Sequence, residues 1–132
     1  MPKTVPPALT NHLLPFNWDV KRLWALNAVV ETHPMSTFLD LFDLPFWSSR
    51  PNAGMLFDLT PNQVLADPDR YPHQQQRLEK ADLRYPIDFI RHNGRYFILD
   101  GLHRLVRLHQ QNMETVAVRC HPLSIRVQIE VD

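Results

Sequence analysis

The sequence contains little cysteine, little glycine and no long apolar run, and these shortages exclude several classes of protein. The single cysteine, Cys120, excludes an internal disulfide and a zinc site built from paired cysteines, and it favours a reducing compartment. No stretch approaches the roughly 18 apolar residues of a transmembrane helix. The proline-rich N-terminus lacks the apolar core of a signal peptide. We therefore expect a cytoplasmic protein with no membrane segment.

An excess of charge of one sign is also missing, because 14 lysines and arginines balance 14 acidic residues. Proteins that bind nucleic acid non-specifically usually carry a basic excess, so we expect no nucleic-acid partner. The charges are nevertheless segregated. Residues 31–69 are mainly acidic, and residues 70–107 are mainly basic. This pattern fits two solvated faces of opposite sign, and it also fits a basic patch around a small anionic ligand.

The first half of the chain predicts short helices joined by irregular segments. Several prolines in residues 1–15 predict an extended arm with little regular structure. Capping residues and apolar spacing predict helices over 18–27 and, after Pro34, over 35–42. The aromatic run at 44–47 is typical of a core, and a partner surface is the alternative.

The middle of the chain predicts a loop over 48–55 and a short strand over 55–57. Thr60 then caps a helix over 61–66, and a glutamine-rich helix follows over 73–80.

The second half mixes strands with a helix. Asn-Gly at 93–94 is a strong hairpin signal between two apolar runs. Alternation of apolar and polar residues at the C-terminus predicts a half-buried strand. The expected elements are strands over 87–90 and 95–99, a helix over 101–111 that ends at Asn112, and strands over 115–120 and 125–131. The chain, residues 1–132, is therefore predicted to form a single α+β domain.

The most informative segment is the junction between the strand ending at Leu99 and the next helix. A helix N-terminus leaves backbone N–H groups without intrahelical partners, and its dipole attracts anions. Gly101 would let a ligand approach the backbone. Arg104 offers a planar fork suited to phosphate, and His103 can donate a hydrogen bond or move a proton near neutral pH. These residues predict an anion-binding site.

Asp100, at the cap position, has two interpretations. It can cap its own helix, or it can hold a Mg²⁺ ion that bridges to phosphate oxygens, since hard cations prefer carboxylates. The residues alone leave an ordinary cap with solvated His103 and Arg104 as the alternative to a ligand site.

Residues 94–104 read Gly-Arg-Tyr-Phe-Ile-Leu-Asp-Gly-Leu-His-Arg, after a predicted hairpin turn and into a predicted helix. With the strand that follows, residues 85–121 resemble the core of the ParB/sulfiredoxin-like superfamily. Residues 59–82 resemble, more weakly, the segment before that core in small ParB-like domains. The resemblance implies a compact ParB/sulfiredoxin-like fold, with a small mixed sheet and helices packed on it. It also implies a core over 56–132 behind a helical extension over 16–55.

In that superfamily the Gly-x-x-Arg turn binds nucleotide phosphates. The resemblance therefore implies ATP, ADP or CTP with Mg²⁺ as cofactor, and nucleotide-dependent phosphotransfer or hydrolysis as activity. Carried over by position, Gly101 would approach the phosphate, and His103 and Arg104 would contact it. Asp100 would serve the metal or a proton transfer, so Asp100 and His103 are the candidate catalytic residues.

Two departures narrow the resemblance. Leu102 stands where sulfiredoxin has its catalytic cysteine, which argues against sulfiredoxin chemistry. Cys120 does not replace it, because it lies on a predicted strand and is expected to be a buried structural thiol. The partition ParB proteins continue into a helix-turn-helix, whereas this sequence ends about ten residues after Pro122.

Two further side chains are candidates for the phosphate site. His73 and Arg77 lie four residues apart, on one face of the predicted helix. They either converge on the phosphate or form a solvated polar face. The remaining histidines, among them His33, His92 and His121, show no metal-ligand spacing.

Three functions are compatible with these observations. The first is a nucleotide-dependent enzyme, and the second is a non-catalytic module that binds a nucleotide or another phosphate ligand. In the second, the aromatic residues of the N-terminal half would meet a protein partner; they are Trp18, Trp24, Phe46 and Trp47. The third is a ParB-like DNA-binding protein or nuclease, against which the zero net charge argues.

Overall fold

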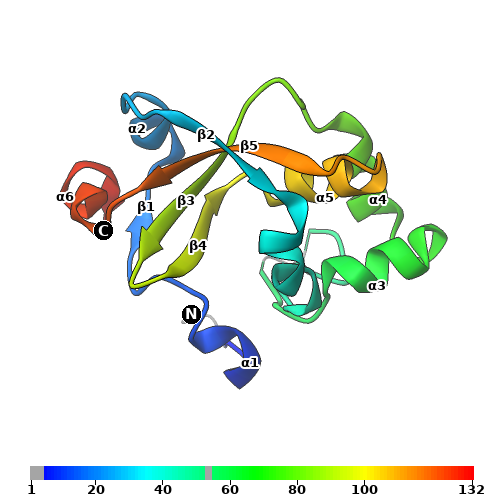
Figure 1. Ribbon diagram of the computed structural model, residues 1–132. Coiled ribbons are helices and arrows are strands. Elements are labelled where there is room, and N and C mark those ends of the chain that lie inside the picture. Colours follow the sequence, from blue (N-terminus) through cyan, green and yellow to red (C-terminus); the bar gives the residue numbers. More distant parts are fainter. Residues whose placement is uncertain (1–4, 53–54) are drawn as a thin grey trace.

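Four strands form a mixed sheet at the centre of the computed structural model, which describes residues 5–52 and 55–132 (Figure 1). The order across the sheet is β2 (Val30–Pro34), β5 (Thr115–His121), β3 (Ile87–His92) and β4 (Arg95–Asp100). Strand β3 runs parallel to β5, and the β2–β5 and β3–β4 pairs are antiparallel. A small second sheet pairs β1 (Asn17–Trp18) with β6 (Glu130–Val131).

The predicted hairpin between β3 and β4 is confirmed. Asn93 and Gly94 both have positive φ, 51° and 75°, as the two central residues of a type I′ turn require. The hairpin places β4 at one edge of the sheet, and its C-terminal end leads directly into α5 (Leu102–Gln110).

The helices are short and lie at both ends of the sheet. In Figure 1, α3, α4 and α5 gather on the right, and α2 and α6 lie on the left. The other elements are α1 (Pro7–Thr10), α2 (Val20–Trp24), α3 (Pro61–Ala66), α4 (Pro72–Lys80) and α6 (Arg126–Ile129), with 3₁₀ helices η1 (Met35–Asp43), η2 (Pro68–Arg70) and η3 (Leu123–Ile125).

Because successive strand residues point to opposite faces, the sheet supports two apolar clusters. Ile87 and Phe89 of β3 belong to the larger cluster, together with residues of η1, α3, α4 and α5. Ile90 and Leu99 belong to the smaller cluster, which includes Leu23 of α2. The α+β class predicted from the sequence is confirmed, and none of the helices in the described ranges is long and apolar enough to cross a bilayer.

Local signals for two helix boundaries are also confirmed. Thr60 and Gln63 form a reciprocal capping box at the start of α3. Asn112, just beyond α5, has a φ of 59°, the left-handed conformation expected after a helix.

The predicted strand over 125–131 is wrong, because this segment forms η3, α6 and only a two-residue strand. Ile125 and Ile129 are buried four residues apart, whereas Val127 between them is 87% exposed. The burial period is therefore that of a helical turn. The alternation of β-branched residues mimicked a strand, although only every fourth residue reaches the core.

Three other segments differ from expectation. Residues 30–34 form β2, which the sequence did not reveal because its inward positions carry the polar Glu31 and His33. Residues 55–57 form no strand, and Trp47 pairs with Leu59 in an isolated bridge instead. In the N-terminal arm, residues 7–10 form α1, and Leu9 is fully buried in the larger cluster.

Candidate functional site

A pocket of about 510 Å³ lies beside the β4–α5 junction. Its lining comes from α2, from the loop before β3, from the sheet and from α5. The lining residues are Trp24, Asp82, Tyr85, Pro86, Asp88, Asp100, Arg104 and Arg119. Two of the predicted site residues, Asp100 and Arg104, thus meet in one cavity.

Trp24 forms one wall of this pocket and is held by Asp100. The indole Nε1 donates a hydrogen bond of 2.9 Å to Asp100 Oδ2. Asp19 caps α2 through the backbone N–H of Lys21, and buried Leu23 anchors the helix on the sheet. Although it makes this bond, Trp24 remains 57% exposed, so its ring is available to a ligand.

Arg104 ties the start of α5 to the loop before β3. Its Nε donates to the Asp82 carbonyl over 2.7 Å, and its Nη1 donates to the Pro86 carbonyl over 3.0 Å. Its guanidinium also lies 5.8 Å from the ring centroid of Tyr85. Arg104 therefore shapes the pocket, and two of its three nitrogens already have protein partners.

Gly101 begins α5 with a left-handed backbone, φ 105° and ψ 21°. A Cβ at this position would lie 2.8 Å from Arg104 Nη1 and 3.1 Å from Ile87 Cδ1. Glycine is therefore needed for the backbone conformation and for the close packing of Arg104 and Ile87. The space beside the Gly101 Cα is filled by the side chains of Arg104 and Ile87. The sequence had instead predicted that glycine is needed there so that a phosphate can approach the backbone.

The N-terminus of α5 has no side-chain cap. The Asp100 carboxylate, which was one candidate for the cap, bonds Trp24 instead. The first-turn N–H groups of a helix have no intrahelical partners, and among the residues that the structure describes no side chain caps them. The positive end of the helix therefore keeps its capacity to attract an anion.

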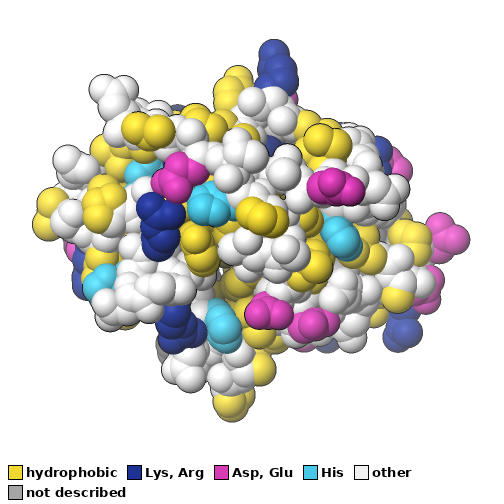
Figure 2. Space-filling model, viewed as in Figure 1, with side chains coloured by type: hydrophobic (Ala, Val, Ile, Leu, Met, Phe, Trp, Pro, Cys, Tyr) yellow, Lys and Arg dark blue, Asp and Glu magenta, His cyan; other side chains and the backbone are white. Residues whose placement is uncertain are grey.

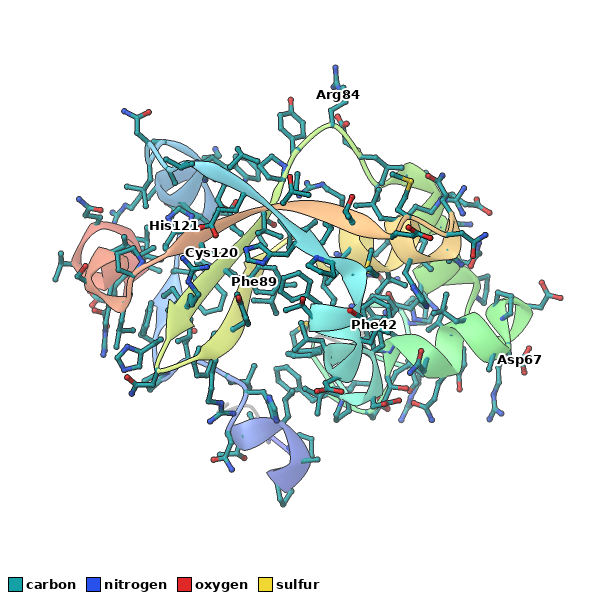
Figure 3. The ribbon with its side chains drawn as sticks, in the orientation of Figure 1. Phe42, Asp67, Arg84, Phe89, Cys120 and His121 are labelled. Carbon is teal, nitrogen blue, oxygen red and sulfur yellow. The ribbon has the colours of Figure 1, made fainter. Side chains whose placement is uncertain are left out.

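The loop before β3 carries an exposed ion pair between Asp82 and Arg84, at 2.7 Å. Hydrogen bonds from Arg84 lower the pKa of Asp82 from 3.8 to about 2. Arg84 stands at the tip of the loop (Figure 3), and its guanidinium lies 5.6 Å from the Tyr85 ring centroid. Tyr85, itself 57% exposed, thus forms a second aromatic wall of the pocket.

Asp88 also lines the pocket, and its buried carboxylate accepts hydrogen bonds from two side chains, Arg119 and His121. Arg119 Nε donates to Asp88 Oδ1 over 2.7 Å, and His121 Nε2 donates to the same oxygen over 2.9 Å. The other nitrogens of Arg119 bond the carbonyls of Leu23 and Leu26. This network fastens α2 to the sheet, so it fixes the position of the Trp24 wall.

His103 does not line the pocket. Its Nε2 donates to Gln74 Oε1 over 2.7 Å, and its ring stacks on Trp47 with centroids 4.2 Å apart. Burial lowers its pKa from 6.5 to about 3, with a smaller contribution from the charge of Arg77. His103 is therefore neutral near pH 7 and joins α5 to α4.

His73 and Arg77 also lie outside the pocket lining. His73 Nε2 donates to the Ser48 carbonyl over 3.0 Å, and Gln74 Nε2 bonds the same oxygen. Arg77 is exposed on α4. The predicted convergence of these two side chains with Gly101 and Arg104 on one phosphate therefore has no counterpart in the pocket.

The aromatic residues proposed for a protein partner have separate positions. Phe46 and Trp47 are buried in the larger apolar cluster. Trp18 is half-buried and bonds the Leu99 carbonyl through Nε1. Only Trp24 among the four is well exposed, and it belongs to the pocket.

Sequence reasoning missed several lining residues, in particular Trp24, Asp88 and Arg119 as members of the site. Tyr85-Pro86 directly precedes β3, and Asp88 interrupts the apolar strand Ile87–Ile90. A charged residue within a buried strand is a usable signal, because burying a charge requires a partner. Trp24 offered no such signal, since its spacing matched an apolar helix face.

Among the residues that the structure describes, one group of three metal-type donors lies close enough to share an ion, and it is not at Asp100. It consists of Glu31, His33 and Cys120. Any ion at Asp100 would have to complete its coordination with ligand oxygens and water.

No family model, curated protein or solved structure matches this chain, so its α+β fold and its pocket stand on the observations above.

Proposed function

We propose that the pocket at the β4–α5 junction binds a nucleotide, with its phosphates towards the start of α5 and its base between the aromatic walls. The observation that carries the proposal is the placement of two exposed aromatic rings beside an uncapped helix N-terminus. The volume of about 510 Å³ lies within the range of small-molecule sites.

The phosphate end rests on α5 and Arg104. First-turn N–H groups and the helix dipole favour negative charge at this end. Among the described residues, no protein acceptor lies at Nη2 of Arg104, while its Nε and Nη1 hold the loop in place. A guanidinium fixed by two backbone carbonyls is well oriented for an oxygen ligand.

The base end rests on Trp24 and Tyr85. Each of these residues is 57% exposed, although tryptophan in particular is highly buried on average. Stacking on such rings is sequence-tolerant for bases and contributes about 1–3 kcal/mol per base in single-stranded nucleic-acid sites. A flat heterocycle is therefore the ligand part that these walls favour.

The acidic residues of the pocket favour a nucleotide that binds with Mg²⁺. Asp82, Asp88 and Asp100 all line the cavity, and a bare polyphosphate would be repelled by them. Asp82 and Asp88 already have cationic partners. Asp100 uses one oxygen for Trp24, which leaves the other as the candidate ligand for a hard cation.

Nucleotide hydrolysis or phosphotransfer is the extension of this proposal. In it, Asp100 holds Mg²⁺ or accepts a proton, and Arg104 with the helix N-terminus stabilises phosphate charge in the transition state. We assign no catalytic part to His103, because its ring is engaged with Gln74 and Trp47. Membership of the ParB/sulfiredoxin-like superfamily remains part of the same proposal and rests on the resemblance of residues 85–121.

A thermal-shift screen tests the binding. ATP, ADP, CTP, GTP and inorganic phosphate are added with and without Mg²⁺ to the wild type and to Tyr85→Ala. We expect a nucleotide with Mg²⁺ at about a hundred times its dissociation constant to stabilise the wild type by roughly 2.7 kcal/mol. Tyr85→Ala should weaken nucleotide binding and leave phosphate binding unchanged.

Tyr71→Ala provides the matched control, since Tyr71 also has the preceding arginine over its ring, at 5.7 Å, and lies outside the pocket lining. No stabilisation of the wild type by any nucleotide contradicts the proposal. Stabilisation without turnover in a phosphate-release assay supports the binding and rejects the catalytic extension.

A further inference from the structure

Three side chains with metal-binding atoms meet on the face of the sheet occupied by the larger apolar cluster. Glu31 and His33 lie two positions apart on β2 and so share one face of the strand, and Cys120 lies near them on β5. One carboxylate oxygen, one imidazole nitrogen and the sulfur all lie within 4.8 Å of one another. Figure 3 shows Cys120 beside Phe89, its partner across the parallel β3–β5 pair.

We propose that Glu31, His33 and Cys120 form a binding site for a zinc-type divalent metal ion. The proposal is independent of the nucleotide site. Arg119 and His121, the neighbours of Cys120, bond Asp88 on the opposite face of the sheet.

The donor set is the reason for zinc. Zn²⁺ binds thiolate sulfur, imidazole nitrogen and carboxylate oxygen, usually with tetrahedral geometry. With Zn–ligand bonds of about 2.0–2.3 Å, neighbouring donors in a tetrahedral site lie about 3.3–3.8 Å apart. Glu31 Oε1 and His33 Nε2 are already 3.1 Å apart, and all three donors lie within 4.8 Å. Small side-chain rotations therefore suffice to enclose an ion.

The imidazole is held in place by aromatic neighbours. The ring of His33 meets Phe38 and Tyr96 edge to face, with centroid distances of 6.2 and 6.0 Å. His33 bonds Glu31 through Nε2, and a metal ion would take the place of that shared proton. The imidazole would then carry its proton on Nδ1 instead of Nε2, and the Cys120 thiol would release its proton to solvent on coordination.

Arg91 is the group that competes with the ion. Its Nη1 and Nη2 donate to the two oxygens of Glu31 over 3.1 and 3.2 Å. Each carboxylate oxygen can accept more than one bond, so Arg91 can stay on Oε2 while the ion takes Oε1. The carboxylate and thiolate together bring two negative charges to the ion, so the site with Arg91 carries a single positive charge.

The cluster is open to solvent on one side. The side chains of His33 and Glu31 are 21% and 34% exposed. Glu31 and Cys120 also line a second pocket of about 460 Å³, beside the segment 26–29. On the face drawn in Figure 2, acidic, basic and histidine side chains lie together at the surface. The opening gives the ion an entry path and leaves a fourth position for water or another small ligand, as in zinc sites with three protein ligands.

Cobalt titration provides a direct test on the full, reduced chain. Tetrahedral Co²⁺ is a spectroscopic substitute for Zn²⁺, and its bond to a thiolate gives a charge-transfer band in the near ultraviolet. Cys120 is the only cysteine, so such a band reports this residue alone. We expect the band to saturate at one Co²⁺ per chain and to disappear when Zn²⁺ is added. Absence of the band in the wild type overturns the proposal.

Variants separate this site from adventitious binding. Loss of an outer-shell partner of a metal ligand typically lowers affinity about 10- to 100-fold, so loss of a direct ligand should lower it by about 100-fold or more. Cys120→Ser should abolish the band, and His33→Gln and Glu31→Gln should each lower Co²⁺ and Zn²⁺ affinity by that factor. The control is His92→Gln, in the exposed β3–β4 hairpin, which should keep the wild-type affinity.

Unchanged affinity in both His33→Gln and Glu31→Gln would overturn the site, as would a stoichiometry of one ion per two chains, which indicates thiolates from two copies. Circular dichroism of each variant confirms the fold. If Cys120→Ser fails to fold, the band measured in His33→Gln and Glu31→Gln decides the question.

Discussion

The indole Nε1 of Trp24 donates a hydrogen bond of 2.9 Å to Asp100 Oδ2, which joins two residues 76 positions apart in the chain. Through this bond the N-terminal segment completes a pocket whose other walls come from the second half of the chain. The residues of α2 are therefore part of the candidate site. A truncated chain that begins at residue 56 would lose one aromatic wall.

Gly101→Ala should destabilise the fold and reshape the pocket. The added Cβ would lie 2.8 Å from Arg104 Nη1, and the backbone has a φ of 105°, which L-residues rarely adopt. Strained backbone of this kind costs about 1–3 kcal/mol. Chemical denaturation of the variant, with the same ligand titration as for the wild type, measures both effects.

Gly94→Ala is the matched control for that substitution. Gly94 also has a positive φ, 75°, but a Cβ there would meet nothing within 4 Å. The Gly94→Ala variant should therefore lose only the stability that a strained backbone costs, and its ligand binding should remain at the wild-type level. Equal losses of stability in the two variants would mean that the packing of Arg104 over Gly101 contributes nothing.

Asp100→Asn separates the electrostatic and metal-binding parts of the site. Without Mg²⁺, removal of the negative charge should tighten binding of a nucleotide, because the carboxylate repels phosphate. With Mg²⁺, the wild type should bind more tightly, and the variant should gain little. Calorimetric titrations with and without EDTA measure the difference. An identical Mg²⁺ effect in both proteins would exclude Asp100 as a metal ligand.

Because His103 is buried, the free energy of unfolding should fall as the pH is lowered into the mildly acidic range. Burial lowers its folded-state pKa to about 3, whereas the unfolded chain has a value near 6.5. Below pH 6.5 the unfolded state therefore binds a proton that the folded state does not bind. The stabilisation is fully present above about pH 6.5 and is lost as the pH falls towards 3, by up to about 1.4 kcal/mol per pH unit.

His103→Phe tests that origin. Phenylalanine can keep the stack on Trp47 but loses the hydrogen bond to Gln74. We expect lower stability at pH 7 and a flatter dependence of the unfolding free energy between pH 6.5 and 4. The same slope in wild type and variant would assign the acid sensitivity to other groups.

Asp88→Asn should be strongly destabilising. The Asp88 side chain is 4% exposed, and its charge compensates Arg119, which is 12% exposed. Removal of one partner from a buried ion pair costs about 3–5 kcal/mol. Asp82→Asn, at an exposed pair, should leave the melting temperature almost unchanged. If urea denaturation gives similar values for both variants, the Asp88 network does not hold α2 on the sheet.

Much of the second half of the fold was predictable, because local signals and tertiary packing agree there. The Asn93-Gly94 turn, the capping box at Thr60 and the left-handed Asn112 are each set by neighbouring residues. The segments around β2 and α6 were not predictable in this way. Their burial depends on distant partners, such as the pairing of residues 30–34 with β5.

The candidate site was predictable only at its centre. Local sequence predicts that a strand ends at Asp100-Gly101 and that a helix begins there. The structure places Asp100 and Arg104 in the pocket. The sequence did not show that His103 turns towards Gln74, because the direction of a side chain on a half-buried helix depends on the helix packed against it. It also left Cys120 and His33 as isolated residues, since only the β2–β5 pairing brings them together.

The central claim is that an anion binds at the start of α5, and the backbone amides of that turn report it most directly. Two-dimensional ¹H–¹⁵N NMR spectra of the wild type should be recorded during titration with a nucleotide and Mg²⁺. Our account predicts saturable shifts of the Leu102, His103 and Arg104 amides and of the indole N–H of Trp24, which bonds Asp100. Saturable shifts confined to other parts of the chain, or no shifts with any nucleotide, would contradict it.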